Sequence, residues 1–141
     1  MTVSPTTRVS LVARLKNARD NEAWLEFASI YEPVIVRIAC RAGLQPADAQ
    51  DVCQQVLAAV AKDVEQWQPD GREASFRRWL FRIARNRVLK LIQSQARRPS
   101  NESSLPFPWE DKIDSREPIS AVFEREYRMQ LLHQAAAAIR G

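Results

Sequence analysis

Apolar residues recur at intervals of three and four along most of this chain, and this spacing restricts the chain to few folds. It places apolar side chains on one face of each helix that the sequence predicts up to residue 98. The chain has only three glycines, too few for many tight hairpins, and no segment shows the alternating pattern of a strand. We therefore predict an all-α fold, a compact helical bundle followed by a linker and one C-terminal helix.

Capping and breaking residues mark the first two helices. A short helix is expected over about residues 7–18. The second begins after a cap at Asp20 or Asn21 and runs to about Ala42. Pro33 lies inside it and is expected to bend the helix without ending it, because the apolar pattern resumes in phase beyond the proline.

The next two helices are separated by a predicted loop. Pro46 suits the first turn of the third helix, which is expected to run to about Trp67. A Pro-Asp-Gly sequence then breaks the chain in a loop of Gln68 to Ala74. Ser75 is expected to cap the fourth helix.

Composition divides the 141 residues into three parts. Residues 1–98 form the predicted helical domain, and residues 99–118, which hold four of the eight prolines, read as an extended linker. Helical spacing returns over residues 119–141, where an apolar face has no following segment to cover it. We interpret this last part as the start of a further domain that is cut short.

Charge is concentrated in one segment. Between Ala74 and Asn101 there are eight basic residues and no acidic one, which leaves 13 basic and 17 acidic residues for the rest of the chain. Such a local positive field favours a polyanion, and nucleic acid is the first candidate. The candidate DNA-binding residues are Arg77, Arg78, Arg82, Arg85, Asn86 and Lys90. The alternative is a solvated basic helix face with its aromatic residues in the core.

A second polar face lies on the third predicted helix. It carries Asp48, Asp51, Gln54 and Gln55 at helical spacing, which suits docking onto a basic partner helix or a plain solvated face. No third acidic or histidine ligand lies near the two aspartates, so we expect no metal site.

The remaining reactive residues are few. Cys40 and Cys53 lie on predicted apolar stripes and are interpreted as buried small hydrophobes, and His133 has no partner for catalysis. We therefore expect no catalytic residue, no cofactor and no enzymatic activity. No apolar run is long enough to span a membrane and no signal peptide is visible, so a cytoplasmic protein is expected.

Taken in order, these segments resemble region 2 of bacterial sigma factors, and most closely the extracytoplasmic-function group of alternative sigma factors. The resemblance covers about residues 20–98. Its first motif is the aspartate-containing stretch with Asp48, Ala49, Asp51 and Gln54, and its second is Phe76, Arg77, Trp79, Leu80, Ile83, Ala84, Arg85 and Asn86. The tail from Phe123 to Arg140 is similar to the first helix of region 4.

The resemblance implies a transcription initiation factor that binds core RNA polymerase and recognises the promoter −10 element as single-stranded DNA. It implies that the face with Asp48, Asp51, Gln54 and Gln55 docks onto the coiled coil of the largest polymerase subunit. The fourth helix and the loop before it would hold the non-template strand, with one base flipped out of the stack. Because only the opening helix of a region 4 is visible, we expect no recognition of a −35 element. An anti-sigma factor is left open as a further partner.

Two other classes remain as alternatives. One is a helical protein-interaction domain whose basic face meets an acidic partner, which sequence-dependent binding to single-stranded promoter DNA would exclude. The other is a nuclease or transferase, which the absence of a carboxylate cluster, a Cys/His pair and a phosphate-binding loop in the sequence disfavours.

Overall fold

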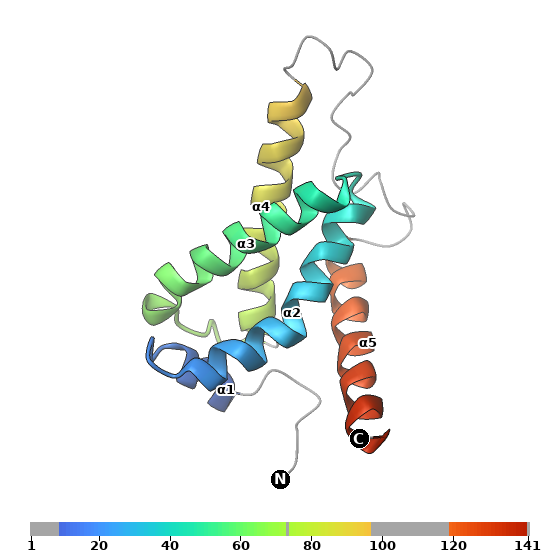
Figure 1. Ribbon diagram of the computed structural model, residues 1–141. Helices are drawn as coiled ribbons and strands as arrows, with labels where there is room; N and C mark the ends of the chain where they lie inside the picture. Colours follow the sequence, from blue (N-terminus) through green and yellow to red (C-terminus); the bar gives the residue numbers. More distant parts are fainter. Residues whose placement is uncertain (1–8, 73, 97–118, 141) are drawn as a thin grey trace.

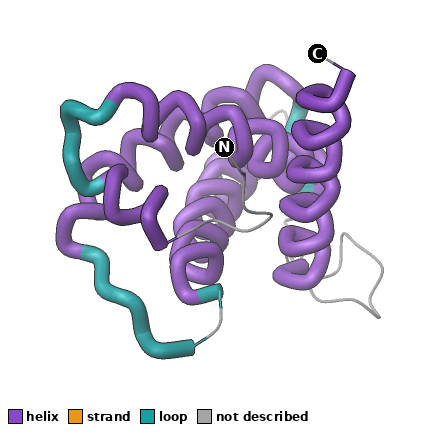
Figure 2. The backbone as a smooth tube through the Cα atoms, turned by 90° about the horizontal axis from the view of Figure 1, so that it is seen from below, coloured by secondary structure: helices purple, strands orange, loops and turns teal. Residues whose placement is uncertain are grey.

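A computed structural model describes residues 9–72, 74–96 and 119–140 of the chain (Figure 1). Within these ranges the structure is helical and contains no strand (Figure 2). The elements are α1 (Val9–Leu15), α2 (Asn21–Arg41), α3 (Pro46–Asp63), the 3₁₀ turn η1 (Val64–Gln66), α4 (Ser75–Ala96) and α5 (Ile119–Arg140). The predicted all-α fold is confirmed.

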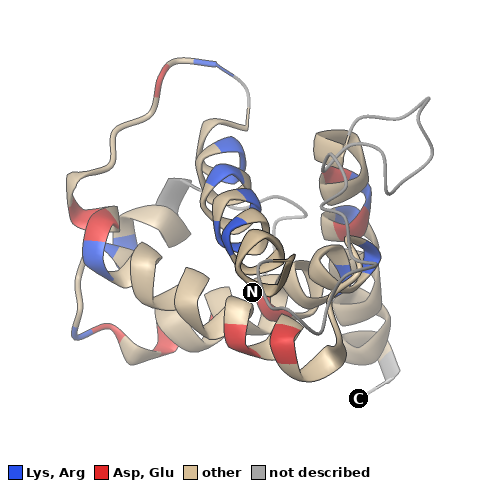
Figure 3. Cartoon of the chain, turned by 90° about the horizontal axis from the view of Figure 1, so that it is seen from above, with Lys and Arg blue, Asp and Glu red and all other residues tan. Residues whose placement is uncertain are grey.

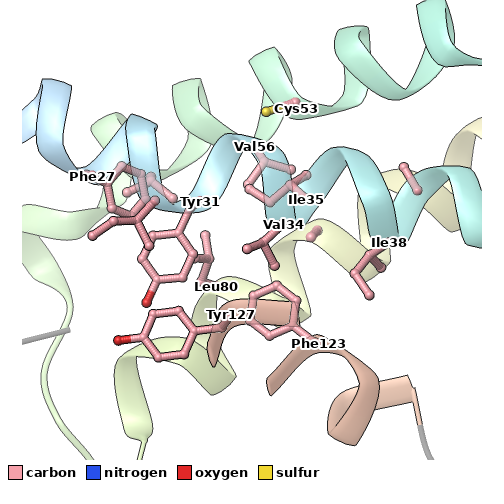
Figure 4. Packing of buried hydrophobic residues seen from close by; sticks show 14 of the residues in the cluster. Phe27, Tyr31, Val34, Ile35, Ile38, Cys53, Val56, Leu80, Phe123 and Tyr127 are labelled. Carbon is pink, nitrogen blue, oxygen red and sulfur yellow. The ribbon is translucent and has the colours of Figure 1, made fainter. Parts of the chain in front are cut away.

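Helix α2 is the centre of the fold. It packs against α1, α3 and α5, while α4 lies against α3 and, through a smaller contact, against α5 (Figure 1). Its apolar face supplies Phe27, Tyr31, Val34, Ile35 and Ile38 to the core, where they meet α3 side chains such as Val56 and the Leu80 side chain of α4 (Figure 4). The core thus fixes α3 and α4, which carry the two predicted binding faces.

The predicted start of α2 is present, and the helix runs on through Pro33 as expected. The Asp20 carboxylate caps the helix by accepting a hydrogen bond from the Ala23 amide at 3.0 Å, and Arg14 donates to the same carboxylate at 3.0 Å. These two donors, first the Arg14 side chain, hold the pKa of Asp20 below its ordinary value. Pro33 lies inside the helix, which continues to Arg41.

The connection from α3 to α4 differs from the prediction. Helix α3 ends at Asp63, and after η1 the backbone of Trp67 is extended. This lets the Trp67 ring reach α4, where its centroid lies 5.4 Å from that of Phe76. Ser75 is the first residue of α4 instead of its cap, because the carbonyl of Ala74, at φ +57°, accepts the first helical bond from the Arg78 amide.

The two cysteines have different environments. Cys53 is buried beside α2, as predicted, and burial raises the pKa of its thiol to about 12. Cys40 is exposed, so the prediction that it is buried is wrong. Consecutive residues of a helix point about 100° apart, and Cys40 follows the fully buried Ala39 on the rim of the apolar stripe.

The predicted C-terminal helix is present as α5 and packs on the bundle. Val122, Phe123 and Tyr127 are all buried, with Tyr127 beside Tyr31 of α2 (Figure 4) and Phe123 beside Phe81 of α4. Helix α1 is three residues shorter at its C-terminal end than expected, since it ends at Leu15. The predicted linker, residues 99–118, lies outside the described residues.

Candidate nucleic-acid interface

One side of α4 presents an exposed polar line. Arg82, Asn86 and Lys90 are exposed and lie four residues apart, so they follow one another along the helix surface. The opposite side carries Leu80 and Val88, both buried in the core. Lys and Arg recur along α4 without any Asp or Glu among them (Figure 3). The helix is therefore held by its apolar side and offers a positive surface to solvent.

Two further arginines lie beside this line. Arg85 is half-buried on the flank of α4. Arg78, in the first turn, is half-buried and forms a two-pronged ion pair with Asp70, with both nitrogen–oxygen distances at 2.9 Å. Five of the six predicted DNA-binding residues thus lie on or next to the exposed line, and one of these five, Arg78, is already engaged by the preceding loop.

Arg77 lies on another side of α4. Its Nε donates to both carboxylate oxygens of Glu124 on α5, each at 3.0 Å, and its guanidinium carbon is 4.5 Å from the centroid of the Tyr127 ring. The side chain is only 14% exposed. The structure therefore separates Arg77 from Arg82, Asn86 and Lys90 and joins it to the contact between α4 and α5.

The polar face of α3 forms a second surface. Asp51, Gln54 and Gln55 are exposed on the side of α3 away from its buried residue Val52. Asp48 is half-buried, and its Oδ2 accepts a hydrogen bond from Nε2 of Gln95 at 2.8 Å. Asp48 therefore links the start of α3 to the end of α4, and the other three residues form the open part of the face.

A hollow lies between the first turns of α4 and α5. Its volume is about 350 Å³, and it is lined by Ala74, Arg77, Arg78, Phe81, Ser120, Ala121, Phe123, Glu124 and Arg128. Of the described loop residues, Ala74 alone reaches it. The hollow reaches Arg77 and Arg78 at the start of α4 but is not lined by Arg82, Asn86 or Lys90.

Metal-ligand clusters and membrane-spanning helices are both absent from the described residues. Within residues 9–72, 74–96 and 119–140, no three His, Cys, Asp or Glu side chains are grouped so that they could hold a metal ion. Over the same ranges no helix has the length and apolar character required to cross a membrane.

Sequence reasoning missed the acidic residues of α5. Glu126 is only 5% exposed and accepts hydrogen bonds from Arg37 at 3.1 Å and Arg41 at 2.9 Å, both on α2. Glu126 falls between the apolar residues Phe123 and Tyr127 in the helical pattern. A carboxylate in that position is a signal for a buried ion pair, because an unpaired buried charge is costly.

Comparisons with known proteins agree with this architecture. The family model for Sigma-70 region 2 matches residues 27–98. The chain is 26% identical over 131 residues to the ECF RNA polymerase sigma factor RpoE of Cereibacter sphaeroides, an alignment that covers 93% of this chain and 68% of that protein. No solved structure gave a significant match.

Proposed function

This chain belongs to the extracytoplasmic-function group of the sigma-70 family, and we propose that the exposed side of α4 binds the promoter −10 element as single-stranded DNA. Proteins of this family are non-enzymatic transcription initiation factors that bind core RNA polymerase and promoter DNA. Two surfaces of this chain, one on α3 and one on α4, are assigned to these contacts. We propose that the chain binds DNA and polymerase in the cytoplasm.

The exposed line on α4 carries the DNA part of the proposal. Arg82 and Lys90 supply positive charge for phosphates, and Asn86 between them supplies an amide that both donates and accepts hydrogen bonds. Phosphate contacts position a strand, whereas contacts to base edges distinguish sequences. The line therefore combines a sequence-independent part with a sequence-dependent part, and Arg85 extends it on its flank. Arg77 is not assigned to this surface, because it is engaged with Glu124.

The α3 face carries the polymerase part of the proposal. Asp51, Gln54 and Gln55 are exposed together, and we assign them to the coiled coil of the largest polymerase subunit. Asp48 would contribute from the edge of this face, where Gln95 holds one of its oxygens. The α3 and α4 surfaces lie on different helices that pack against each other, so one rigid body would present DNA and polymerase contacts together.

Binding of core RNA polymerase tests the α3 assignment. The double variant Asp51→Arg/Gln54→Arg changes two exposed side chains, so we expect native thermal stability and loss of polymerase binding. The matched control is Glu65→Arg/Gln66→Arg, which makes the same two kinds of change on exposed residues of η1. Equal dissociation constants for the two double variants would remove the α3 face from the proposal.

A further inference from the structure

The segment that connects η1 to α4 is anchored at its start by aromatic packing. The Trp67 ring lies 5.4 Å from Phe76 and 5.9 Å from Trp79, measured between centroids. Nζ of Lys16, in the turn after α1, donates to the Trp67 carbonyl at 2.8 Å. Trp67, the first residue of the connection, is therefore fixed both to α4 and to the turn after α1.

Asp70 attaches the middle of the segment to α4. Its two carboxylate oxygens accept hydrogen bonds from the two terminal nitrogens of Arg78, and Oδ1 also accepts from the Arg72 amide, all at 2.9 Å. These donors, first the Arg78 side chain, lower the pKa of Asp70. Gly71, at φ +79°, supplies the left-handed conformation that the turn needs.

The ion pair with Asp70 gives Arg78 a different role from the DNA contact that the basic segment suggested. Its forked end faces a carboxylate of the preceding segment, and the planar, two-pronged arrangement is the one that arginine makes best with a carboxylate. A lysine in the same place would keep the charge and lose the fork. The pair connects the residues just before α4 to the first turn of the helix that carries the proposed DNA surface.

We infer that Asp70 and Arg78 are positioning residues that hold residues 68–72 in one shape and thereby set which base the −10 surface prefers. The inference rests on the proposed function and deepens it, since it names residues that determine specificity at the same surface. A connection held in one conformation presents the same groups to every base, so it favours the base that fits. A loosened connection adapts to each base and discriminates less.

A direct phosphate contact by Arg78 would predict different changes in DNA affinity. If Arg78 acted on a phosphate and Asp70 merely competed for it, Asp70→Asn would free the guanidinium and strengthen binding to every sequence alike. Arg78→Lys would then be nearly neutral, because a lysine also serves as a phosphate-binding charge. The positioning role predicts that both variants reduce the preference between bases.

The test is a binding series with the full chain, using −10 single strands in which one base is varied, at several salt concentrations. We expect Asp70→Asn and Arg78→Lys each to reduce the affinity ratio between preferred and substituted strands by roughly tenfold, about the value of one good base contact. The double variant should lose no more than either single variant, because both remove the same connection. Asp63→Asn, the same change on another exposed aspartate, is the matched control and should keep the wild-type ratio.

A second measurement does not depend on DNA. Amide hydrogen exchange over residues 68–72 should rise in both variants and stay at its wild-type rate in α2. If wild-type protein shows no base preference, the proposed function fails, while exchange still tests whether the pair holds the segment. Unchanged exchange, or tighter binding of Asp70→Asn to all strands, would overturn the positioning role.

Discussion

Tyr31 of α2 and Tyr127 of α5 stack with their ring planes 7° apart and their centroids 5.4 Å apart (Figure 4). The Arg77 guanidinium lies over the Tyr127 ring, so one tyrosine joins α5 to both α2 and α4. This contact explains why one arginine of the basic helix is directed away from the others. It also means that α5 contributes to the stability of the body that carries both proposed surfaces.

Tyr127→Ala should destabilise the whole chain. The side chain is 1% exposed, and its removal would take away the stacked ring and the partner of Arg77. We expect a loss of about 3 kcal/mol in the free energy of unfolding, measured by urea denaturation. The control Leu132→Ala, on the same helix at 69% exposure, should stay within about 0.5 kcal/mol of wild type. Similar losses for both variants would show that α5 does not pack as described.

Substitutions of two arginines of α4 should have different effects, one on stability and the other on DNA binding. Arg77→Ala removes the partner of the Glu124 carboxylate and should lower stability, with the salt dependence of single-strand binding unchanged. Arg82→Ala, on the exposed line, should leave stability unchanged and reduce the slope of log affinity against log salt by about 0.7. The assignment of the two sides of α4 would be reversed if Arg77→Ala lowered the slope and Arg82→Ala did not.

The sequence was sufficient to predict the helices and inadequate to orient their polar residues. Apolar spacing located the bundle and the continuation of α2 through Pro33, because burial of one helix face depends on residue order alone. It did not predict that Arg77 contacts Glu124 of α5, because these two residues are 47 apart in the chain. The exposure of Cys40 and the extended backbone at Trp67 were missed for a related reason. The exposure of Cys40 and the backbone of Trp67 both depend on how the neighbouring helices pack, which local spacing does not describe.

The two cysteines should differ in reactivity. The thiolate is the nucleophilic form, and burial raises the pKa of Cys53 to about 12, so very little of this thiol is ionised near pH 8. Cys40 is exposed. A disulfide-exchange reagent at pH 8 should therefore titrate one thiol per chain rapidly in the native protein and two in urea. Rapid reaction of both thiols without denaturant would contradict the burial of Cys53.

Acid should remove the contribution of Asp20. Its pKa is lowered from 3.8 by the Arg14 side chain and the Ala23 amide, so its ionised form stabilises the fold at pH values above 3.8. This stabilisation is lost as the pH falls through the lower pKa of the folded state. Asp20→Asn should thus be less stable than wild type at pH 6, and the difference in urea midpoint should shrink toward pH 3. A difference that stays constant over this range would contradict the ion pair.

Asn86→Ala tests the central claim, that the exposed side of α4 reads single-stranded −10 DNA, most directly. Asn86 is exposed between Arg82 and Lys90, so its removal should leave the fold intact. The measurement is the affinity of wild type and Asn86→Ala for a series of −10 single strands at fixed salt. We predict a loss of about 1–3 kcal/mol on the preferred strand and little change on the others. An equal loss on every strand, or none on any, would contradict the claim.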